Sequence, residues 1–329
     1  MTRIATPVRL LRGRDKSYFM DAVDEFESEL QLVFPHVDVQ DVHLLSFKRL
    51  AIRAFRRARS YLPSSLLRLA PHPTGGSVQL SVQMGPDFAS VIPHFLQGGP
   101  NFIYMFDGWP RYMPWLVDFV DYFNVRTIFF SARDSCRLFN ERKGQLGNRG
   151  RWLPEGIAPD GYHFAPPEEK QIDVLEFGRR FESYHHQIQP VLAQANKNHV
   201  YGKNDALLFA KKGDLCQALA QSKICVCFPS SMTHPARAEG ISTMTLRYLQ
   251  AMLSKCLVVG IPPSDIVEVI GYDPVVSYDP EDPGGQLLAL LNDWDRHQEL
   301  IERNYSAVTT RHLWRHRLQS IRPFLCEAG

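Results

Sequence analysis

The sequence predicts an α/β protein with two doubly wound, Rossmann-like domains. Apolar runs of strand length alternate with segments of helical periodicity along the chain, and this order is typical of parallel sheets flanked by helices. The chain has 329 residues, which is long for one core and enough for two domains. A stretch rich in Pro, Gly and charge, 156–171, separates the two sets of α/β units and is predicted to be a linker.

The first predicted domain covers residues 1–155. Its strands are apolar or alternating runs, and we place them at 6–11, 77–84, 102–107, 126–132 and 151–157. Its helices carry apolar residues at helical spacing, and we place them at 17–34, 110–123 and 133–143.

The second predicted domain covers residues 172–308, and a last helical segment, 309–329, is expected to pack back toward the first domain. Its strands are placed at 172–178, 204–210, 224–230, 256–262 and 275–279. Its helices are placed at 182–195, 213–223, 263–271 and 283–310, with one more helix ahead of the strand at 256–262. Ligands of doubly wound sheets lie beyond the carboxyl ends of the strands, so the residues that follow the strands are the candidate site residues.

The composition excludes several classes of protein. The net charge of +2 does not indicate nucleic-acid binding. The N-terminal residues lack the apolar core of a secretory signal, and none of the six cysteines forms a C-x-x-C pair, so we expect a cytoplasmic protein. The motifs of dinucleotide-binding proteins, P-loop proteins, zinc proteases and α/β-hydrolases are all absent from the sequence.

A basic stretch, 48–62, contains six Lys and Arg residues and no acid. Its apolar residues could line one side of a helix, which would allow peripheral contact with an anionic membrane at the inner face. A solvated basic face is the other interpretation, and both remain open.

Two arginines follow the strand that is predicted at 172–178. Gly178 allows the backbone to turn sharply where a strand meets a ligand. Arg179 and Arg180 then place guanidinium groups at the carboxyl end of the strand, where they suit a diphosphate. A pair of solvated surface arginines is the alternative.

The stretch "EGISTMTLRYLQAMLSKCLVVG", 239–260, reads as a loop, a helix and a buried strand. Helix N-termini favour anionic groups such as phosphate, and Arg247 would add a full charge one turn into this helix. A plain helix that packs on the sheet is the alternative. The candidate N-cap residues are Ser242, Thr243 and Thr245.

These segments together resemble the group-one nucleotide-sugar glycosyltransferases of the GT-B fold. The resemblance is carried by "RWLPEGIAPDGYHF", "VLEFGRRF", "ICVCFPSSMTHPARAEGISTMTLRYLQAMLSKCLVV" and "IVEVIGYDPVVSYDPEDP", which follow one another in the family's order over roughly 151–293. The chain is most similar to the short bacterial branch that includes spore-coat maturation-type glycosyltransferases. The resemblance implies two Rossmann-like domains that face a central cleft.

The resemblance also implies roles for single residues. Arg179 would bind the donor's diphosphate, and Gly240 would let the diphosphate approach the helix. Glu239 resembles the acid that faces the donor sugar, and Asp107 would lie on the acceptor side. Gln250 stands where the family usually has a ribose-binding Glu.

Two departures from the family pattern concern charge. The Lys that usually follows the Gly-Arg pair is missing, and Arg180, His185 and Arg247 are the candidates to replace it. Eleven residues separate Glu239 from Gln250, where the larger branch has paired acids eight apart.

The expected function is transfer of a sugar, of hexosyltransferase type, from a nucleoside-diphosphate sugar to a glycan, lipid-linked or small-molecule acceptor. No metal ion or other cofactor is expected, and retention of the anomeric configuration is favoured over inversion. An inverting enzyme would need a general base, for which Asp107 and His94 are candidates. A non-catalytic nucleotide- or glycan-binding protein, and a sugar-phosphate enzyme such as a phosphorylase or epimerase, are the alternatives.

Overall fold

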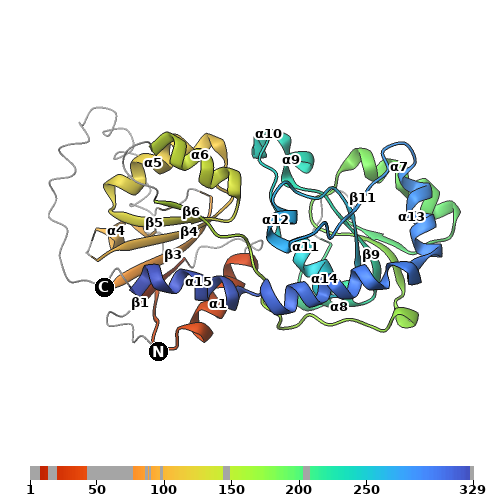
Figure 1. Ribbon diagram of the computed structural model, residues 1–329, viewed down its shortest axis with the longest axis horizontal. Helices are drawn as coiled ribbons and strands as arrows, with labels where there is room; N and C mark the ends of the chain where they lie inside the picture. Colours follow the sequence, from red (N-terminus) through yellow and green to blue (C-terminus); the bar gives the residue numbers. More distant parts are fainter. Residues whose placement is uncertain are drawn as a thin grey trace. The chain divides into compact units, whose positions relative to one another are not determined.

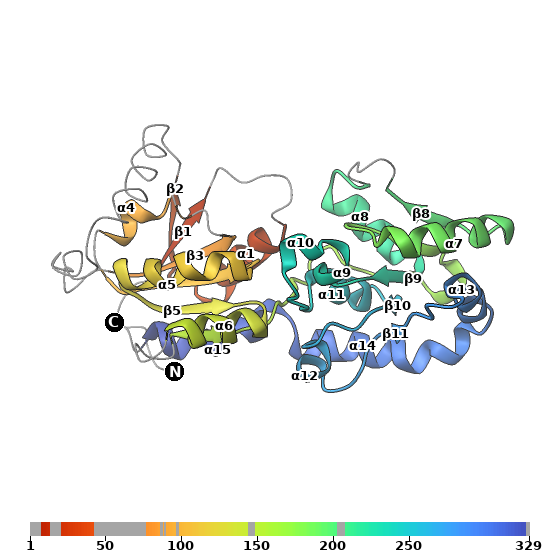
Figure 2. The ribbon, with the colours of Figure 1, turned by 90° about the horizontal axis from the view of Figure 1, so that it is seen from above.

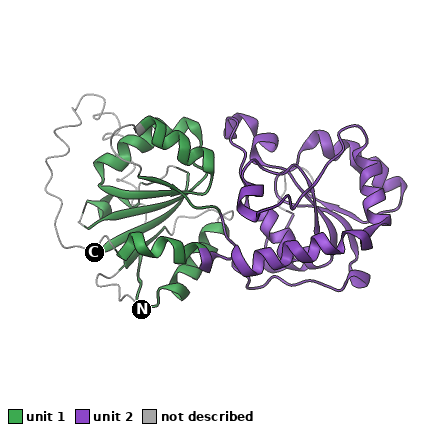
Figure 3. Ribbon diagram, in the orientation of Figure 1, with its two compact units in different colours: residues 1–154, 317–329 green, residues 155–316 purple. Residues whose placement is uncertain are grey.

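The computed structural model describes residues 8–13, 21–42, 77–85, 88, 90–96, 99–143, 149–202 and 208–326. The chain forms two compact units, which Figure 3 colours separately. Unit 1 contains residues 1–154 and 317–329, and unit 2 contains residues 155–316. The basic stretch 48–62 lies outside the described residues. Among the helices that are described, none combines the length and the apolar character that crossing a membrane requires.

Unit 1 is built on a six-stranded parallel sheet in the order β2-β1-β3-β4-β5-β6 (Figure 1). Its strands are β1 (Val8–Gly13), β2 (Asp38–Val42), β3 (Val78–Met84), β4 (Asn101–Phe106), β5 (Val125–Phe130) and β6 (Gly150–Trp152). Its helices are α1 (Asp21–Val33), α4 (Ile92–Phe95), α5 (Met113–Tyr122) and α6 (Arg133–Lys143), with a 3-10 turn at Pro110–Tyr112.

The burial of the central strand β4 shows that this sheet is covered on both faces. All six of its residues are buried, as in parallel strands with helices on either side. Ile103 and Met105 pack into the cluster formed with α4, α5 and α6. Tyr104 points the other way and lies 4.7 Å, between ring centroids, from Phe26 of α1. The C-terminal helix α15 (Trp314–Cys326) also packs on the α1 face, where Phe324 contacts Phe129 of β5.

Unit 2 is built on a five-stranded parallel sheet in the order β11-β10-β9-β7-β8. Its strands are β7 (Ile172–Glu176), β8 (His199–Tyr201), β9 (Ser222–Cys227), β10 (Leu257–Gly260) and β11 (Val276–Ser277). Its helices are α7 (Glu182–Gln194), α8 (Lys212–Ala220), α9 (Ser230–Thr233), α10 (Pro235–Ala238), α11 (Leu246–Leu253), α12 (Ile266–Ile270), α13 (Pro283–Asn292) and α14 (Gln298–Arg311). Short 3-10 turns lie at Pro167–Glu169 and Trp294–His297.

Helices cover both faces of this second sheet, as Figures 1 and 2 show. The apolar side chains of α7 and α13 form one core with the inward residues of β7, β9 and β10. Helices α8, α11 and α14 cover the opposite face. The predicted α/β class with two parallel, doubly wound sheets is therefore confirmed.

The strand order of unit 2 defines a topological switch point. The chain leaves β7 for β8 on one side of it and then crosses to β9 on the other side. Helices on opposite faces diverge at such a point, and a crevice opens beyond the carboxyl ends of the two strands. The ends of β7 and β9 are therefore the place in unit 2 where a ligand is expected.

The segment predicted as a linker, 156–171, belongs to unit 2. Its anchor is Lys170, a buried side chain whose ammonium group donates to the carbonyl oxygens of Ala220 at 3.0 Å, Ser222 at 2.8 Å and Ser254 at 3.2 Å. The chain returns to unit 1 between residues 316 and 317, inside α15. Residue 308, the predicted end of the second domain, lies inside α14.

One predicted strand of unit 2 differs from the structure. Residues 204–207 of the run at 204–210 lie outside the described residues, and 208–210 form no strand. The strand that pairs with β7 is His199–Tyr201 instead. This strand, His-Val-Tyr, is only three residues long and has a single aliphatic residue, so the apolar run that predicts the other strands is absent from it.

Candidate functional site

The candidate site of unit 2 lies where β7 and β9 end at the switch point. The two strands pair directly, with Val174 opposite Ile224. After β7 the backbone turns at Gly178, whose φ of +70° lies in the left-handed region that favours glycine. After β9 the chain forms the short helices α9 and α10. The residues predicted from the two strand ends are thereby brought to one edge of the sheet.

Arg247 joins the two strand ends. One of its terminal nitrogens donates to the carbonyl oxygen of Arg179 at 2.8 Å and of Phe177 at 3.5 Å. The other donates to the carbonyl oxygen of Phe228 at 3.0 Å. The sequence suggested that Arg247 adds a charge next to a phosphate. In the structure its charge lies at the switch point, while its N–H groups hold backbone carbonyls.

Three arginines lie near enough to His234, which separates α9 from α10, for their charges to affect its pKa. Burial lowers the pKa of His234, and the positive charges of Arg179, Arg237 and Arg247 lower it further. A histidine in such surroundings is neutral at pH 7, so the arginines dominate the local potential. The switch point of unit 2 is consequently an electropositive place, and an anion would be stabilised there.

The two arginines after β7 have different surroundings. Arg179 approaches the hydroxyl group of Ser230, the first residue of α9, at 3.5 Å. Arg180 forms a salt bridge with Glu182 at 3.1 Å and also donates to the carbonyl oxygen of Gly202. The guanidinium of Arg180 is therefore held on α7 and at the end of β8, and that of Arg179 lies near the start of α9.

The loop before α11 is held by hydrogen bonds to Ser264 and Asp265, which the sequence motifs did not predict. The buried carboxylate of Asp265 accepts from the hydroxyl of Thr243 and from the backbone N–H of Met244, both at 2.7 Å. Ser264 donates to the carbonyl oxygen of Ser242 at 2.8 Å. Asp265 directly precedes α12, a position typical of a helix N-cap, but its side chain makes no capping hydrogen bond there. It binds the loop before α11 instead, and no spacing in the sequence predicts that contact.

Thr245 is the N-cap residue of α11, as the sequence allowed. Its hydroxyl oxygen is buried and has no hydrogen-bond partner among the described residues. Ahead of it, Glu239 ends α10 with φ +49°, and Gly240 follows with φ +85°. Glycine adopts this region freely, but a glutamate there is strained by about 1–2 kcal/mol, and such strain is common at functional sites.

Gln250 lies inside unit 2. Its side chain is buried, and its amide nitrogen donates to the hydroxyl of Tyr162 at 2.8 Å. Tyr162 comes from the segment 156–171. One N–H of the Gln250 amide is therefore already used inside unit 2.

We expect Gln250→Glu to lower the free energy of unfolding by about 1–3 kcal/mol at pH 7, because it buries a carboxylate that has one neutral donor nearby. The loss should diminish as the pH falls, since burial raises the pKa of the new carboxyl group and the protonated form is tolerated. Urea unfolding at pH 7 and pH 5 measures both effects. A variant as stable as the parent at pH 7 would contradict this placement.

Asp107, the predicted acceptor-side residue, belongs to unit 1. It directly follows β4, and its backbone φ is +51°. His94 lies in the short helix α4, and its carbonyl oxygen accepts from Gln79 at 3.0 Å. Asp107 and Glu239 are thus both held in the left-handed region, which few residues other than glycine adopt.

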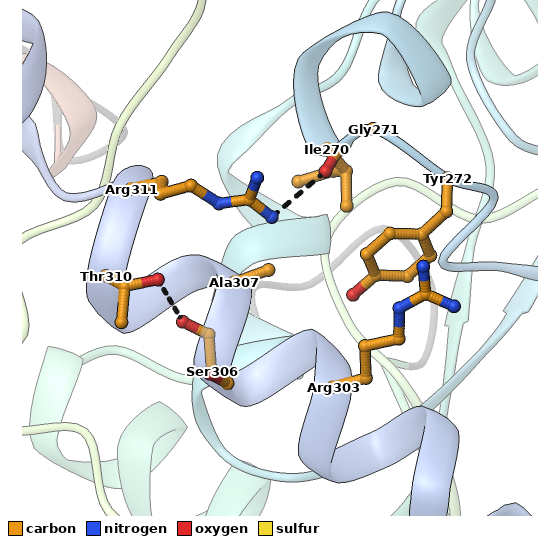
Figure 4. Close-up of a pocket in the computed structure, with 8 residues that line it drawn as sticks. All are labelled: Ile270, Gly271, Tyr272, Arg303, Ser306, Ala307, Thr310 and Arg311. Atoms are coloured by element: carbon orange, nitrogen blue, oxygen red, sulfur yellow. Dashed lines mark hydrogen bonds between the residues drawn. The ribbon is translucent and has the colours of Figure 1, made fainter.

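A groove of about 410 Å³ lies elsewhere in unit 2, between the end of α12 and α14 (Figure 4). The guanidinium of Arg303 lies 3.7 Å from the centroid of the Tyr272 ring, and Arg311 donates to the carbonyl oxygen of Ile270 at 3.3 Å. None of the predicted site residues lines this groove.

Residues 176–322 match the model of a family described as glycosyl transferase-like. HepE of Anabaena, solved in complex with UDP, is similar in structure, with a TM-score of 0.61 and 11% sequence identity; the match covers 98% of this chain and 100% of that one. HepE in complex with UDP-glucose matches with a TM-score of 0.60 at 12% identity, over 98% of this chain and 100% of that one.

Two further solved structures match over most of their length. Sucrose-phosphate synthase from Thermosynechococcus elongatus has a TM-score of 0.58 at 10% identity, and 98% of each chain is covered. The UDP-forming α,α-trehalose-phosphate synthase from Burkholderia xenovorans has a TM-score of 0.54 at 11% identity, over 84% of this chain and 79% of that one. The search of curated proteins found no match.

These likenesses concern the fold of the chain and the sequence of residues 176–322. The chain has the GT-B fold, and its second unit carries a glycosyl transferase-like sequence, which confirms the predicted resemblance to the group-one GT-B glycosyltransferases.

Proposed function

We propose that the protein transfers a sugar from a nucleoside-diphosphate sugar and binds this donor at the switch point of unit 2. The observation that supports the proposal most is the set of three arginines around His234, at the ends of β7 and β9. In this fold a diphosphate lies beyond such strand ends and against a helix N-terminus. HepE was solved with UDP and with UDP-glucose, which favours a uridine nucleotide as the first to test.

The leaving group of this reaction is a diphosphate that gains negative charge as the glycosidic bond breaks. Arg179 would donate to its oxygens, because it lies at the end of β7 beside His234. Gly240 would allow the diphosphate to come close to the backbone, and the hydroxyl group of Thr245 would donate a hydrogen bond to it. We propose that these groups replace the metal ion that other sugar transferases place on the diphosphate. The affinity for UDP should then be the same with and without added Mg²⁺.

Glu239 is proposed to face the donor sugar, and Asp107 to serve the acceptor. Both carboxylates occupy strained backbone positions, which sets them apart from the other acids in the part of the chain that the structure describes. We favour retention of configuration, with the diphosphate itself accepting the acceptor's proton. The acceptor is proposed to be a glycan or a lipid-linked sugar.

We test the activity by incubating the protein with UDP-, GDP- and ADP-sugars and measuring nucleotide release with and without candidate acceptors. Nucleotide release that one donor sustains supports a transferase. Release of sugar phosphate that depends on inorganic phosphate would indicate a phosphorylase instead. Failure of every donor to react or bind would leave only a non-catalytic glycan-binding role and would refute the proposal.

Arg179→Ala should weaken the binding of the donor nucleotide by roughly 10- to 100-fold, the usual cost of one charge-assisted hydrogen bond to a phosphate. Isothermal titration calorimetry with the nucleotide that binds best measures this change. The control is Arg296→Ala, which removes an arginine whose side chain is 80% exposed on the far part of unit 2. Equal affinities of the two variants would remove Arg179 from the site.

A further inference from the structure

A second cluster of chemically reactive side chains lies in unit 2 and has no part in the proposed donor site. Its members are Glu176, the last residue of β7; His185, in the first turns of α7; and His199, the first residue of β8. Three separate elements therefore direct a carboxylate and two imidazoles to one place.

The cluster is compact and shielded from water. One possible ligand atom from each of the three residues lies within 4.8 Å of the other two. Nε2 of His199 lies 3.1 Å from Oε2 of Glu176, and Nδ1 of His185 approaches the same oxygen. The side chains are only 3%, 5% and 6% exposed for Glu176, His185 and His199. The ring of Tyr201 packs against both imidazoles, with centroid distances of 4.6 and 4.7 Å.

The charge of the carboxylate has to be balanced in this surrounding. Burial penalises the charged form of Glu176, and its hydrogen bonds to His185 and His199 offset that cost. A buried carboxylate is stable only beside a positive charge. Two imidazole nitrogens that face one carboxylate oxygen can be bridged by protons or by a metal ion.

We propose that Glu176, His185 and His199 bind a divalent transition-metal ion of the zinc class. Imidazole nitrogen and carboxylate oxygen are the ligands that Zn²⁺ prefers beside thiolate, and three protein ligands leave one position for water. Bonds of about 2.0–2.2 Å hold tetrahedral ligand atoms about 3.4 Å apart, close to the 3.1 Å between His199 and Glu176. The ion displaces the protons that otherwise lie between the three side chains.

The ion would fasten β7, α7 and β8 to one another. Glu176 stands two residues before Gly178 and three before Arg179, so the ion would stabilise the turn on which the proposed diphosphate ligand lies. The ion is a structural one in this proposal, and no step of sugar transfer involves it.

The test uses the full chain without a histidine tag, first treated with a chelator and then dialysed. Titration with Zn²⁺ should show one ion bound per chain, with release of protons and a rise in melting temperature. Co²⁺ should give the intense visible absorption of a tetrahedral site. Glu176→Gln, His185→Gln and His199→Gln should each weaken the binding at least about tenfold, because each removes one of three ligands.

His186→Gln is the matched control, since His186 is the exposed neighbour of His185 on α7 and is not in the cluster. This control should bind Zn²⁺ like the parent. Failure of the parent protein to bind one ion per chain overturns the proposal, and this result does not depend on whether the variants fold. An equal loss of binding in His186→Gln overturns it as well. No nucleotide is used, so the result is independent of the proposed sugar transfer.

Discussion

Replacing Arg247 with methionine should lower the free energy of unfolding by about 2–4 kcal/mol and weaken donor binding at least about 100-fold. Its guanidinium holds the backbone carbonyls at the ends of both β7 and β9. Methionine keeps the apolar stem and removes every donor, so the two strand ends lose their common anchor. The binding site loses a positive charge at the same time.

Arg247→Lys separates these two effects. Lysine keeps the charge, but its single ammonium group lacks the planar fork that reaches carbonyls on two strand ends at once. This variant should lose stability and retain part of the nucleotide affinity. Urea unfolding and calorimetric titration measure the two quantities, and Arg296→Met is the control for loss of an exposed arginine. Stability of Arg247→Met within about 0.5 kcal/mol of the parent would contradict the bridging role.

Lys170→Met should cost about 3 kcal/mol of unfolding free energy, because the buried ammonium group is the common donor to three backbone carbonyls. Two of these carbonyls, those of Ala220 and Ser222, flank the start of β9, and the third follows α11. Without the ammonium group, buried oxygen atoms lose their donor, and the segment 156–171 loses three of its hydrogen bonds to the rest of unit 2.

The control for this prediction is Lys211→Met, which removes an exposed lysine at the start of α8. Urea unfolding should distinguish the two variants by several kcal/mol in the free energy of unfolding, and limited proteolysis should cut Lys170→Met within 156–171 first. Equal stability of the two variants would mean that this segment does not depend on Lys170.

Much of the fold follows from local patterns. Buried strands such as β4 and β9 are short apolar runs, and α6 was predicted with the bounds that the structure has, because its periodicity and its flanking strands agree. Strand β8 was missed, since it is only three residues long and Val200 is its single aliphatic residue. That strand also carries His199, so the histidine cluster could not be foreseen from the pattern.

The candidate site was predicted in part for the same reason. The rule that ligands lie beyond strand ends predicted Gly178, Arg179 and the loop before α11 as site residues, and the structure brings them to the switch point. The rule could not show which hydrogen-bond donors are already bound to other groups of the protein. Arg247 bonds to carbonyls across the switch point, and Gln250 bonds to Tyr162, a residue far away in sequence. Such contacts depend on how the strands are ordered in space.

The switch point of unit 2 is proposed to bind a nucleoside diphosphate. Titration of UDP, GDP and ADP into the purified protein, followed by calorimetry, tests it most directly. We predict saturable binding of one nucleotide per chain, which Arg179→Ala weakens and Arg296→Ala does not, and a stabilisation of about 2.7 kcal/mol at a ligand concentration near 100 Kd. The absence of binding by all three nucleotides, or binding that Arg179→Ala leaves unchanged, would contradict the account.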